Sequence, residues 1–273
     1  MQYVKLTKKF ITQHLMPHLS QSHVGRPPKV PLWRVVKAII YKLRTGTQWN
    51  ELPVRQFFSR ILMSWQSVRY HFEKGSRDNS WKRLWQSLLM LYRSELDMSS
   101  VELDGTHTPV KKGGEQVAYQ KRKSCKTTNV LILTDCQGIP IAMSDPVAGN
   151  HHDLFEIEKS MQKIFDDLAA CRLAVDGLFL NADAGFDSEK MRTICEQAGI
   201  CANIDINKRN AKKTDYEYYV DEQLYQQRFS VEQLNAWVDD FKTLNVRYEW
   251  RVEHWKSFHF LAFSLILLKK FKL

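Results

Sequence analysis

The chain of 273 residues is long enough for one large domain or two smaller ones. Hydrophobic residues make up 44% and charged residues 26%, an ordinary globular composition that excludes a mostly disordered chain. The net charge of +10 is unevenly placed: residues 1–98 hold 17 Lys and Arg against 5 Asp and Glu, and residues 99–273 hold 23 against 25. This asymmetry favours a polyanion-binding module followed by a second module with another task, and the alternative is a basic, solvated surface.

Cysteine use and hydropathy indicate the compartment. The five cysteines are odd in number and form no CxxC pair, which argues against a disulfide framework or a zinc ribbon and fits a reducing cytoplasm. The first residues lack the long apolar run of a signal peptide. The longest apolar stretch, residues 258–268, is far shorter than the ~20 residues that span a bilayer. We therefore expect a cytoplasmic protein with a buried C-terminal helix and no membrane contact.

Apolar residues at helical spacing predict an all-helical domain over residues 1–98. The predicted helices span residues 6–19, 32–43, 54–61, 65–74 and 81–96. The pair 54–61 and 65–74 resembles a helix-turn-helix, and a plain bundle with a basic face is the alternative. Candidate DNA contacts are basic residues of the Gly-Arg-Pro-Pro-Lys segment and of helix 65–74, namely Arg26, Lys29, Arg69 and Lys74.

After residue 98 the pattern changes from helices to alternating strands and helices. Strands are predicted at residues 100–106, 129–134, 139–144, 178–182 and 200–206, and helices at 153–170, 188–198, 230–244 and 250–270. This order predicts an α/β fold over residues 99–273, a mixed sheet of the ribonuclease-H type with flanking helices. A basic hairpin near the first strand contains Lys121, Arg122, Lys123 and Lys126, which contact phosphates or belong to a solvated loop.

Three carboxylates lie where such a sheet would gather them. Asp104 is in the first strand, next to Gly105, whose missing side chain lets a ligand approach closely. Asp183 follows a strand, where α/β sheets place ligands, and Glu232 lies early in the helix 230–244. Hard divalent ions prefer oxygen ligands, and two ions ~3.5–4 Å apart activate an attacking hydroxyl and stabilise the leaving oxygen of a phosphodiester.

Each of these acids, taken alone, fits an exposed turn or surface position better than a metal site, because charged residues are mostly exposed. The occurrence of all three in this element order favours the metal site. Asp187 competes with Asp183 as the second acid, but its position before a helix favours an N-cap. The adjacent residues His151 and His152 fit a solvated or hydrogen-bonded turn better than a metal site.

Several motifs of the chain are similar to those of the DDE transposases of bacterial insertion sequences, in the insertion-sequence-five group. The third acid of that family follows the pattern Tyr, two residues, Arg, three residues, Glu, which is met by Tyr225, Arg228 and Glu232. The family's following basic residue is replaced by Asp239, and Lys242 is the nearest substitute. The other matching segments are Gly25–Pro28, Leu43–Pro53, Leu103–Thr106, Gly149–Asp153 and Asn181–Asp187.

The resemblance implies a transposase that binds element-end inverted repeats in double-stranded DNA, cuts phosphodiester bonds and joins the freed 3′-hydroxyls to target DNA. It implies that Asp104, Asp183 and Glu232 hold two Mg²⁺ or Mn²⁺ ions, that Arg228 holds a phosphate or orients an acid, and that Tyr225 supports this geometry. It also implies a homodimer or larger homo-oligomer on DNA. The alternatives are a metal-dependent nuclease without strand transfer and a transposase-derived DNA-binding protein without catalysis.

Overall fold

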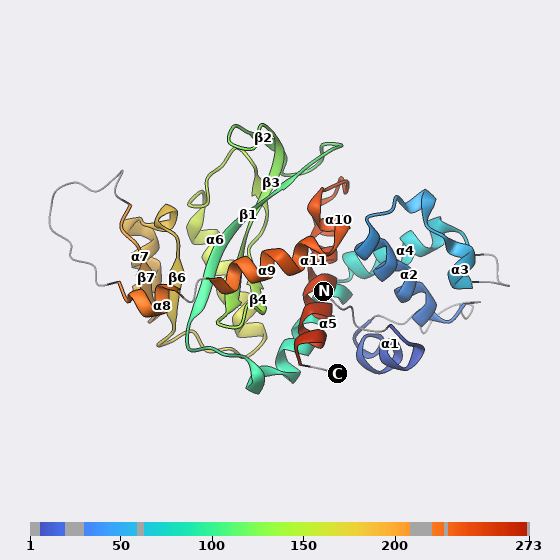
Figure 1. Cartoon of the computed structure of the whole chain (residues 1–273), viewed down its shortest axis with the longest axis horizontal. Helices are drawn as coiled ribbons and strands as arrows, with labels where there is room; N and C mark the ends of the chain where they lie inside the picture. Colours follow the sequence, from blue (N-terminus) through green and yellow to red (C-terminus); the bar gives the residue numbers. More distant parts are fainter. Residues whose placement is uncertain (1–5, 20–29, 59–62, 208–219, 227–228, 272–273) are drawn as a thin grey trace. The chain divides into compact units, whose positions relative to one another are not determined.

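The computed structural model describes residues 6–19, 30–58, 63–207, 220–226 and 229–271. The chain divides into two compact units (Figure 1). Unit 1 combines Met1–Leu91, Lys111–Gly114 and Trp237–Leu273, and unit 2 combines Tyr92–Val110 and Glu115–Ala236.

Unit 1 is helical, as predicted for the N-terminal part of the chain. Its α-helices are α1 (Lys8–His14), α2 (Leu32–Thr45), α3 (Val54–Phe58), α4 (Trp65–Arg77), α5 (Ser80–Leu91), α10 (Lys242–Asn245) and α11 (Val252–Lys270). Ser64 caps α4 as expected, because its hydroxyl accepts a hydrogen bond from the amide of Ser67. Gly46 ends α2 in the left-handed region, with a φ of 69°. Residues 59–62, the end of the first helix and the start of the turn of the predicted helix-turn-helix, lie outside the described residues.

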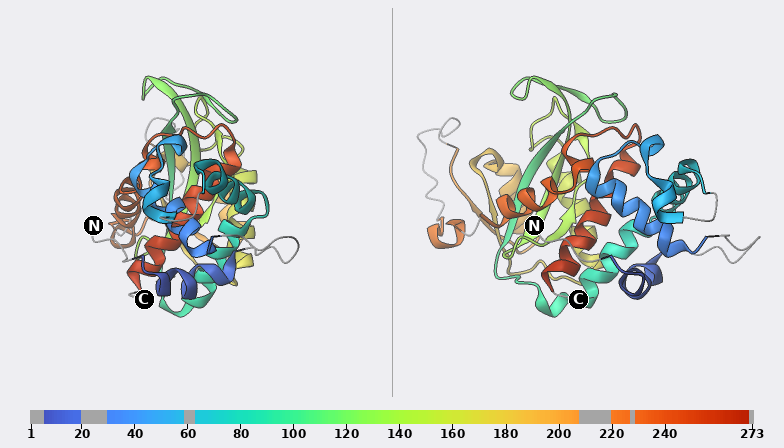
Figure 2. Two further views of the ribbon diagram at one scale, coloured as in Figure 1. Left: turned by 90° about the vertical axis from the view of Figure 1, so that its right-hand side faces the viewer. Right: turned by 45° about the vertical axis from the view of Figure 1, so that its right-hand side comes forward.

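The core of unit 1 is built around α11, which is apolar on all sides and therefore has to be covered on all sides. Phe258 of α11 stacks on Phe72 of α4 with ring centroids 4.1 Å apart, and Phe260 stacks on Trp85 of α5 at 5.3 Å. Figures 1 and 2 show α11 running beside α5. The C-terminal helix thus shares a core with the N-terminal helices, whereas the sequence placed it with the sheet.

Unit 2 contains a mixed sheet, as predicted. Its strands are β1 (Val101–Pro109), β2 (Ala118–Gln120), β3 (Cys125–Asp135), β4 (Pro140–Met143), β5 (Val147–Ala148), β6 (Phe179–Ala182) and β7 (Cys201–Ile204). The order is β2-β3-β1-β6-β7, with β4 and β5 paired to β3. The β1–β3 pair is antiparallel, whereas β1–β6 and β6–β7 are parallel.

The two faces of this sheet differ in polarity because side chains alternate along each strand. Leu103, Leu133 and Ala182 are in register on one face and are buried, and α6 (Ile157–Ala170) and α7 (Glu189–Gln197) contact the neighbouring strands β4 and β7. The other face carries Glu102, Asp104 and Thr106 of β1. The helix α9 (Phe229–Asp239) crosses this polar face (Figure 1).

The predicted helix 230–244 is interrupted. The helix α9 ends at Asp239 and α10 begins at Lys242. Between them the chain turns so that Phe241, which is 3% exposed, enters the core. The free energy gained by burying Phe241 outweighs the local preference of the segment for one continuous helix. Among the described helices, none combines the length and the hydropathy needed to cross a bilayer.

The replacement Phe258→Ala should lower the free energy of unfolding by about 3–5 kcal/mol, because it leaves a cavity against Phe72 and Trp49 in the core of unit 1. Urea denaturation of the full chain measures this change. Tyr70→Ala is the matched control, since Tyr70 is 55% exposed on α4 and should change stability by less than ~0.5 kcal/mol. Equal effects of the two replacements would contradict the assignment of α11 to this core.

His259 of α11 should make stability depend on pH. Burial lowers the pKa of this imidazole to about 4, against the weaker raising effect of a hydrogen bond with the carbonyl of Trp255. The unfolded chain therefore binds the proton first as pH falls below ~6.5, and stability is lost between that value and about 4. The difference in unfolding free energy between the native chain and His259→Gln should narrow or reverse at the acidic end. A difference that is constant with pH would contradict a neutral buried imidazole.

Candidate active site

Two of the predicted acids follow adjacent, in-register strand positions. Leu103 of β1 pairs with Ala182 of β6 in a parallel ladder, and Asp104 and Asp183 are the next residues of their strands. Neighbouring strands lie ~4.8 Å apart, so the two backbones carry these residues side by side at the point where β6 ends. Both residues are partly exposed. The middle of β1 and the carboxyl end of β6 therefore bring the first and second acids together.

Asp183 is fixed by the turn that follows β6. Its carboxylate accepts a hydrogen bond of 2.8 Å from the amide of Gly185 and so caps the short 3₁₀ helix Ala184–Phe186. A Cβ on Gly185 would lie 2.8 Å from the same Oδ1, which explains the glycine at this position. Phe186 is fully buried and anchors the turn. The turn keeps the carboxyl group at the end of the strand.

The first acid also contacts α9, through a residue that the sequence analysis did not single out. Asn235 donates from its amide nitrogen to Asp104 Oδ2 at 3.5 Å, and its amide oxygen accepts from the Thr106 hydroxyl at 3.4 Å. Asn235 thus links α9 to two successive residues on the polar face of β1. Its spacing of three residues from Glu232, which places the two on one side of a helix, was the available sequence indication.

Glu232 lies in the first turn of α9 and is exposed. It forms no hydrogen bond or ion pair with another described residue, and it lies one turn before Asn235. Among the residues that the structure describes, no three His, Cys, Asp or Glu side chains come close enough to hold one ion. The structure thus places two acids side by side and α9 against the first of them, without gathering the three carboxylates into a cluster.

Asp187, the alternative second acid, has a structural role. It pairs with Arg192 at 2.8 Å and accepts a hydrogen bond from the amide of Asn207. The prediction that Asp187 caps the next helix is wrong, because the cap of α7 is Ser188, whose hydroxyl accepts from the amide of Met191. With its carboxylate held by a guanidinium and an amide, Asp187 is a poor candidate for metal binding.

A chain of buried polar side chains lies on the same face of the sheet as Asp104. Asn181 of β6 donates to Glu102 of β1 at 2.8 Å and accepts from Asn203 of β7 at 2.6 Å. The two asparagines also donate to the carbonyls of Leu224 and Asp221, where α8 (Glu222–Gln226) begins. These hydrogen bonds attach the segment of α8 to the sheet. This segment precedes α9, the helix that carries Glu232.

On the opposite face, the space beside Gly105 is taken by the protein itself. The carboxylate of Asp153 occupies the place where a Cβ of Gly105 would stand, and it accepts a 2.7 Å hydrogen bond from Asn129. The glycine therefore serves internal packing rather than the approach of a ligand. Nearby, the ring of His151 stacks on Phe155, and His152 accepts from the amide of Leu154, so both histidines take part in a turn.

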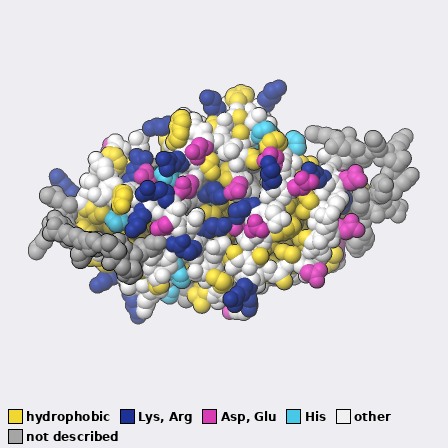
Figure 3. All heavy atoms as spheres, turned by 180° about the vertical axis from the view of Figure 1, so that it is seen from behind, with side chains coloured by type: hydrophobic (Ala, Val, Ile, Leu, Met, Phe, Trp, Pro, Cys, Tyr) yellow, Lys and Arg dark blue, Asp and Glu magenta, His cyan; other side chains and the backbone are white. Residues whose placement is uncertain are grey.

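The predicted basic hairpin lies between β2 and β3, and all four of its predicted DNA contacts are exposed: Lys121, Arg122, Lys123 and Lys126. Lys123 donates to the carbonyl of His107 at 2.7 Å, whereas Tyr119 beside it is 55% exposed. Figure 3 shows one face of the molecule, on which Lys and Arg side chains gather with Asp and Glu between them. The hairpin offers cations at the surface, as phosphate contacts require.

Of the other residues predicted to contact DNA or to support the site, some lie in the described part of the chain and some do not. Arg69 is exposed on α4 and pairs with Glu73 at 2.8 Å, and Lys74 of the same helix is half-buried. Tyr225 is half-buried on α8. Lys242, the substitute for the basic residue missing at Asp239, donates to the carbonyl of Asp239 at 3.0 Å. Arg26, Lys29 and Arg228 lie outside the described residues.

Comparison with known families identifies the chain. Residues 103–267 match the family described as "DDE superfamily endonuclease", and residues 9–85 match a family described as "transposase of IS4/5 family". Because the first match covers more than half of the chain, the chain belongs to the DDE superfamily of endonucleases. With the N-terminal match, it is a DNA transposase, an enzyme that acts on phosphodiester bonds and depends on divalent metal ions.

Two solved transposase structures were compared with the chain, and the first of them supports the fold. The piggyBac transposase in a synaptic complex with hairpin DNA has 9% sequence identity and a TM-score of 0.52, and the match covers 97% of this chain and 74% of that one. The Mos1 transposase in a paired-end complex has 13% identity and a TM-score of 0.30 over 89% of this chain and 79% of that one. The comparison with curated proteins gives no match. The ribonuclease-H-like fold predicted from the sequence is confirmed.

Proposed function

We propose that Asp104, Asp183 and Glu232 form the catalytic carboxylate set and bind two divalent cations, Mg²⁺ or Mn²⁺. The observation that carries this proposal is the parallel pairing of Leu103 with Ala182, which sets the first two acids on adjacent strands, Asp104 within β1 and Asp183 directly after β6. Glu232 supplies the third carboxylate from α9, which Asn235 connects to Asp104. The donor chemistry fits, because all three groups are oxygen ligands and Asp187 is occupied by Arg192.

In this site the chain's residues position the reacting groups. Such ions, when bound, lower the pKa of a water or hydroxyl nucleophile and stabilise the leaving oxygen. Asp104 holds its carboxyl group within β1 and Asp183 at the end of β6, and Asn235 orients Asp104 through its amide. Tyr225 on α8 supports the third acid, and Arg228 takes a phosphate oxygen of the cut strand.

The substrate under this proposal is double-stranded DNA that carries the inverted repeats of an insertion element. The chain cuts at the element ends and joins the freed 3′-hydroxyl groups to target DNA. Residues 1–98 recognise the ends, with Arg26, Lys29, Arg69 and Lys74 as phosphate contacts, because this segment carries the excess positive charge. The protein works as a homodimer or larger homo-oligomer, on nucleoid DNA in the cytoplasm.

Loss of any one acid should abolish both cleavage and joining. Asp104→Asn, Asp183→Asn and Glu232→Gln each remove one ligand charge, and the expected loss of rate is at least about a hundredfold. A double variant should be hardly worse than a single one, because the acids act as a unit. Cleavage of an element-end duplex in Mg²⁺, followed by joining to a circular target, measures both steps.

Asp187→Asn is the matched control for this series, since it removes the same charge from a residue that pairs with Arg192. It should lower stability modestly and keep cleavage. An inactive Asp187→Asn beside an active Asp183→Asn would show that the second acid is misassigned. Cleavage without joining in the native chain would favour the plain nuclease, and activity in all single variants would refute the carboxylate site.

The basic hairpin should contribute to DNA affinity through phosphate contacts. Replacing Lys121, Arg122 and Lys126 together by Gln should weaken binding and reduce the salt slope of log K by about 2–3, since each phosphate contact releases ~0.9 counterion. Fluorescence anisotropy over a range of salt concentrations gives this slope. Replacing Lys159, Arg172 and Lys190 by Gln removes the same charge from exposed positions of unit 2 outside the hairpin. An equal change in that control would contradict a specific role for the hairpin.

A further inference from the structure

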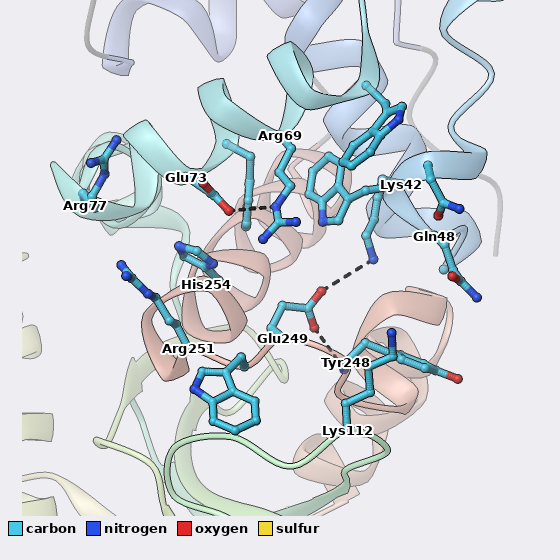
Figure 4. Close-up of a pocket in the computed structure, with 16 residues that line it drawn as sticks. Lys42, Gln48, Arg69, Glu73, Arg77, Lys112, Tyr248, Glu249, Arg251 and His254 are labelled. Carbon is cyan, nitrogen blue, oxygen red and sulfur yellow. Dashed lines mark hydrogen bonds and ion pairs between the residues drawn. The ribbon is translucent and has the colours of Figure 1, made fainter.

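Unit 1 contains a cavity of about 660 Å³ that the site described above does not use. Figure 4 shows its labelled side chains, with Arg69 and Glu73 from α4 facing Glu249, and with His254 and Arg251 beside them. The segment after α10 and the first turn of α11 supply Tyr248 to His254, and α2 supplies Lys42. Its volume lies within the ~300–1,000 Å³ usual for pockets that bind small ligands.

The charges in this pocket are balanced in the interior and unbalanced at the surface. Lys42 and Glu249, whose side chains are 5% and 7% exposed, pair at 3.6 Å, and Arg69 pairs with Glu73. Arg77, Lys112 and Arg251 also line the pocket and form no ion pair with any described residue. Burial lowers the pKa of His254 and so favours its neutral form. The pocket therefore presents three cations that can bind an anionic ligand.

Two exposed aromatic rings belong to the same pocket. Trp250 is 65% exposed and Tyr248 is 46% exposed. The backbone between them is fixed by hydrogen bonds. The fully buried guanidinium of Arg247 donates to the carbonyls of Glu249 and Trp250 at 2.9 and 3.0 Å. The segment is also anchored by the amide of Lys111, which donates to the carbonyl of Arg247 at 3.1 Å. Large aromatic side chains on a rigid segment lose little entropy when a flat ligand stacks on them.

We propose that this pocket binds a nucleotide, with its phosphate on Arg77 and Arg251, which lie on one side of the pocket (Figure 4), and its base against Trp250 and Tyr248. Cations recognise the phosphate, and an exposed ring recognises any base whose face is free, since base–aromatic stacking tolerates every sequence. An inorganic anion would leave the two rings without a partner. The bases of an intact duplex have no free face to offer. The nucleotide comes either from solution or from an unpaired position in the DNA substrate, and the second source rests on the transposase function.

Isothermal titration calorimetry of the full chain with ADP, in EDTA to prevent cleavage, tests the free nucleotide. ADP should bind, and inorganic pyrophosphate should bind at least about fivefold more weakly because it has no base, a factor that corresponds to ~1 kcal/mol of stacking. Trp250→Ala should lower ADP affinity by at least about fivefold, and Arg251→Gln should lower it through the phosphate. Tyr70→Ala and Lys9→Gln are the matched controls, as exposed residues of unit 1 outside the pocket.

Anisotropy of a labelled duplex tests the DNA source under the same conditions. A duplex with one unpaired terminal nucleotide should bind more tightly than the blunt duplex, and Trp250→Ala should remove the difference. A Trp250-dependent effect with ADP alone assigns the pocket to a free nucleotide, and an effect with the unpaired end assigns it to DNA. The proposal is overturned if neither ligand shows a Trp250-dependent affinity, or if pyrophosphate binds as well as ADP. These assays measure binding without metal, so a failure of the carboxylate site would leave their result unchanged.

Discussion

The hydrogen bonds between Glu102, Asn181 and Asn203 are the constraint on which the candidate active site depends. These side chains are buried on one face of the sheet, where each polar atom without a partner would cost roughly 1–3 kcal/mol. They hydrogen-bond to one another across β1, β6 and β7, and the two asparagines also donate to the carbonyls of Asp221 and Leu224. The sheet register and the start of α8 are therefore fixed together. Since α8 leads into α9, the same bonds constrain the helix that carries the third acid.

Sequence periodicity was sufficient for most elements of the fold. Strand alternation located β1 and its Asp104, an apolar run located β6, and the rule that ligands lie at strand carboxyl ends selected Asp183 as a candidate. It was insufficient wherever a long-range partner decides the role of a residue. Nothing local shows that Arg192 pairs with Asp187, that Asp153 fills the space beside Gly105, or that Asn235 reaches Asp104.

The division of the chain into units was also only partly predictable from the sequence. Charge counting separated residues 1–98 from the rest, but a hydrophobic helix such as α11 packs where enough apolar surface is available. Phe72 and Trp85 supply that surface, so α11 completes the core of the N-terminal helices. A chain cut at residue 98 would leave both parts with exposed apolar faces. The DNA-binding and catalytic roles proposed for the two parts are therefore better tested by surface substitutions than by truncation.

The excess of positive charge in the N-terminal part serves two physical purposes in unit 1. Lys42 belongs to the core: its ammonium group lies 5.1 Å from the ring of Phe258, pairs with Glu249, and has a pKa lowered by burial. Such a charge holds α2 to the segment before α11, and its removal would leave Glu249 buried without its partner, at a cost that exceeds that of a surface pair. Arg77 and Arg251 have no such partner among the described residues. Charges of this second kind can bind DNA or a nucleotide without giving up a protein partner, so net charge overstates the capacity of the domain for anions.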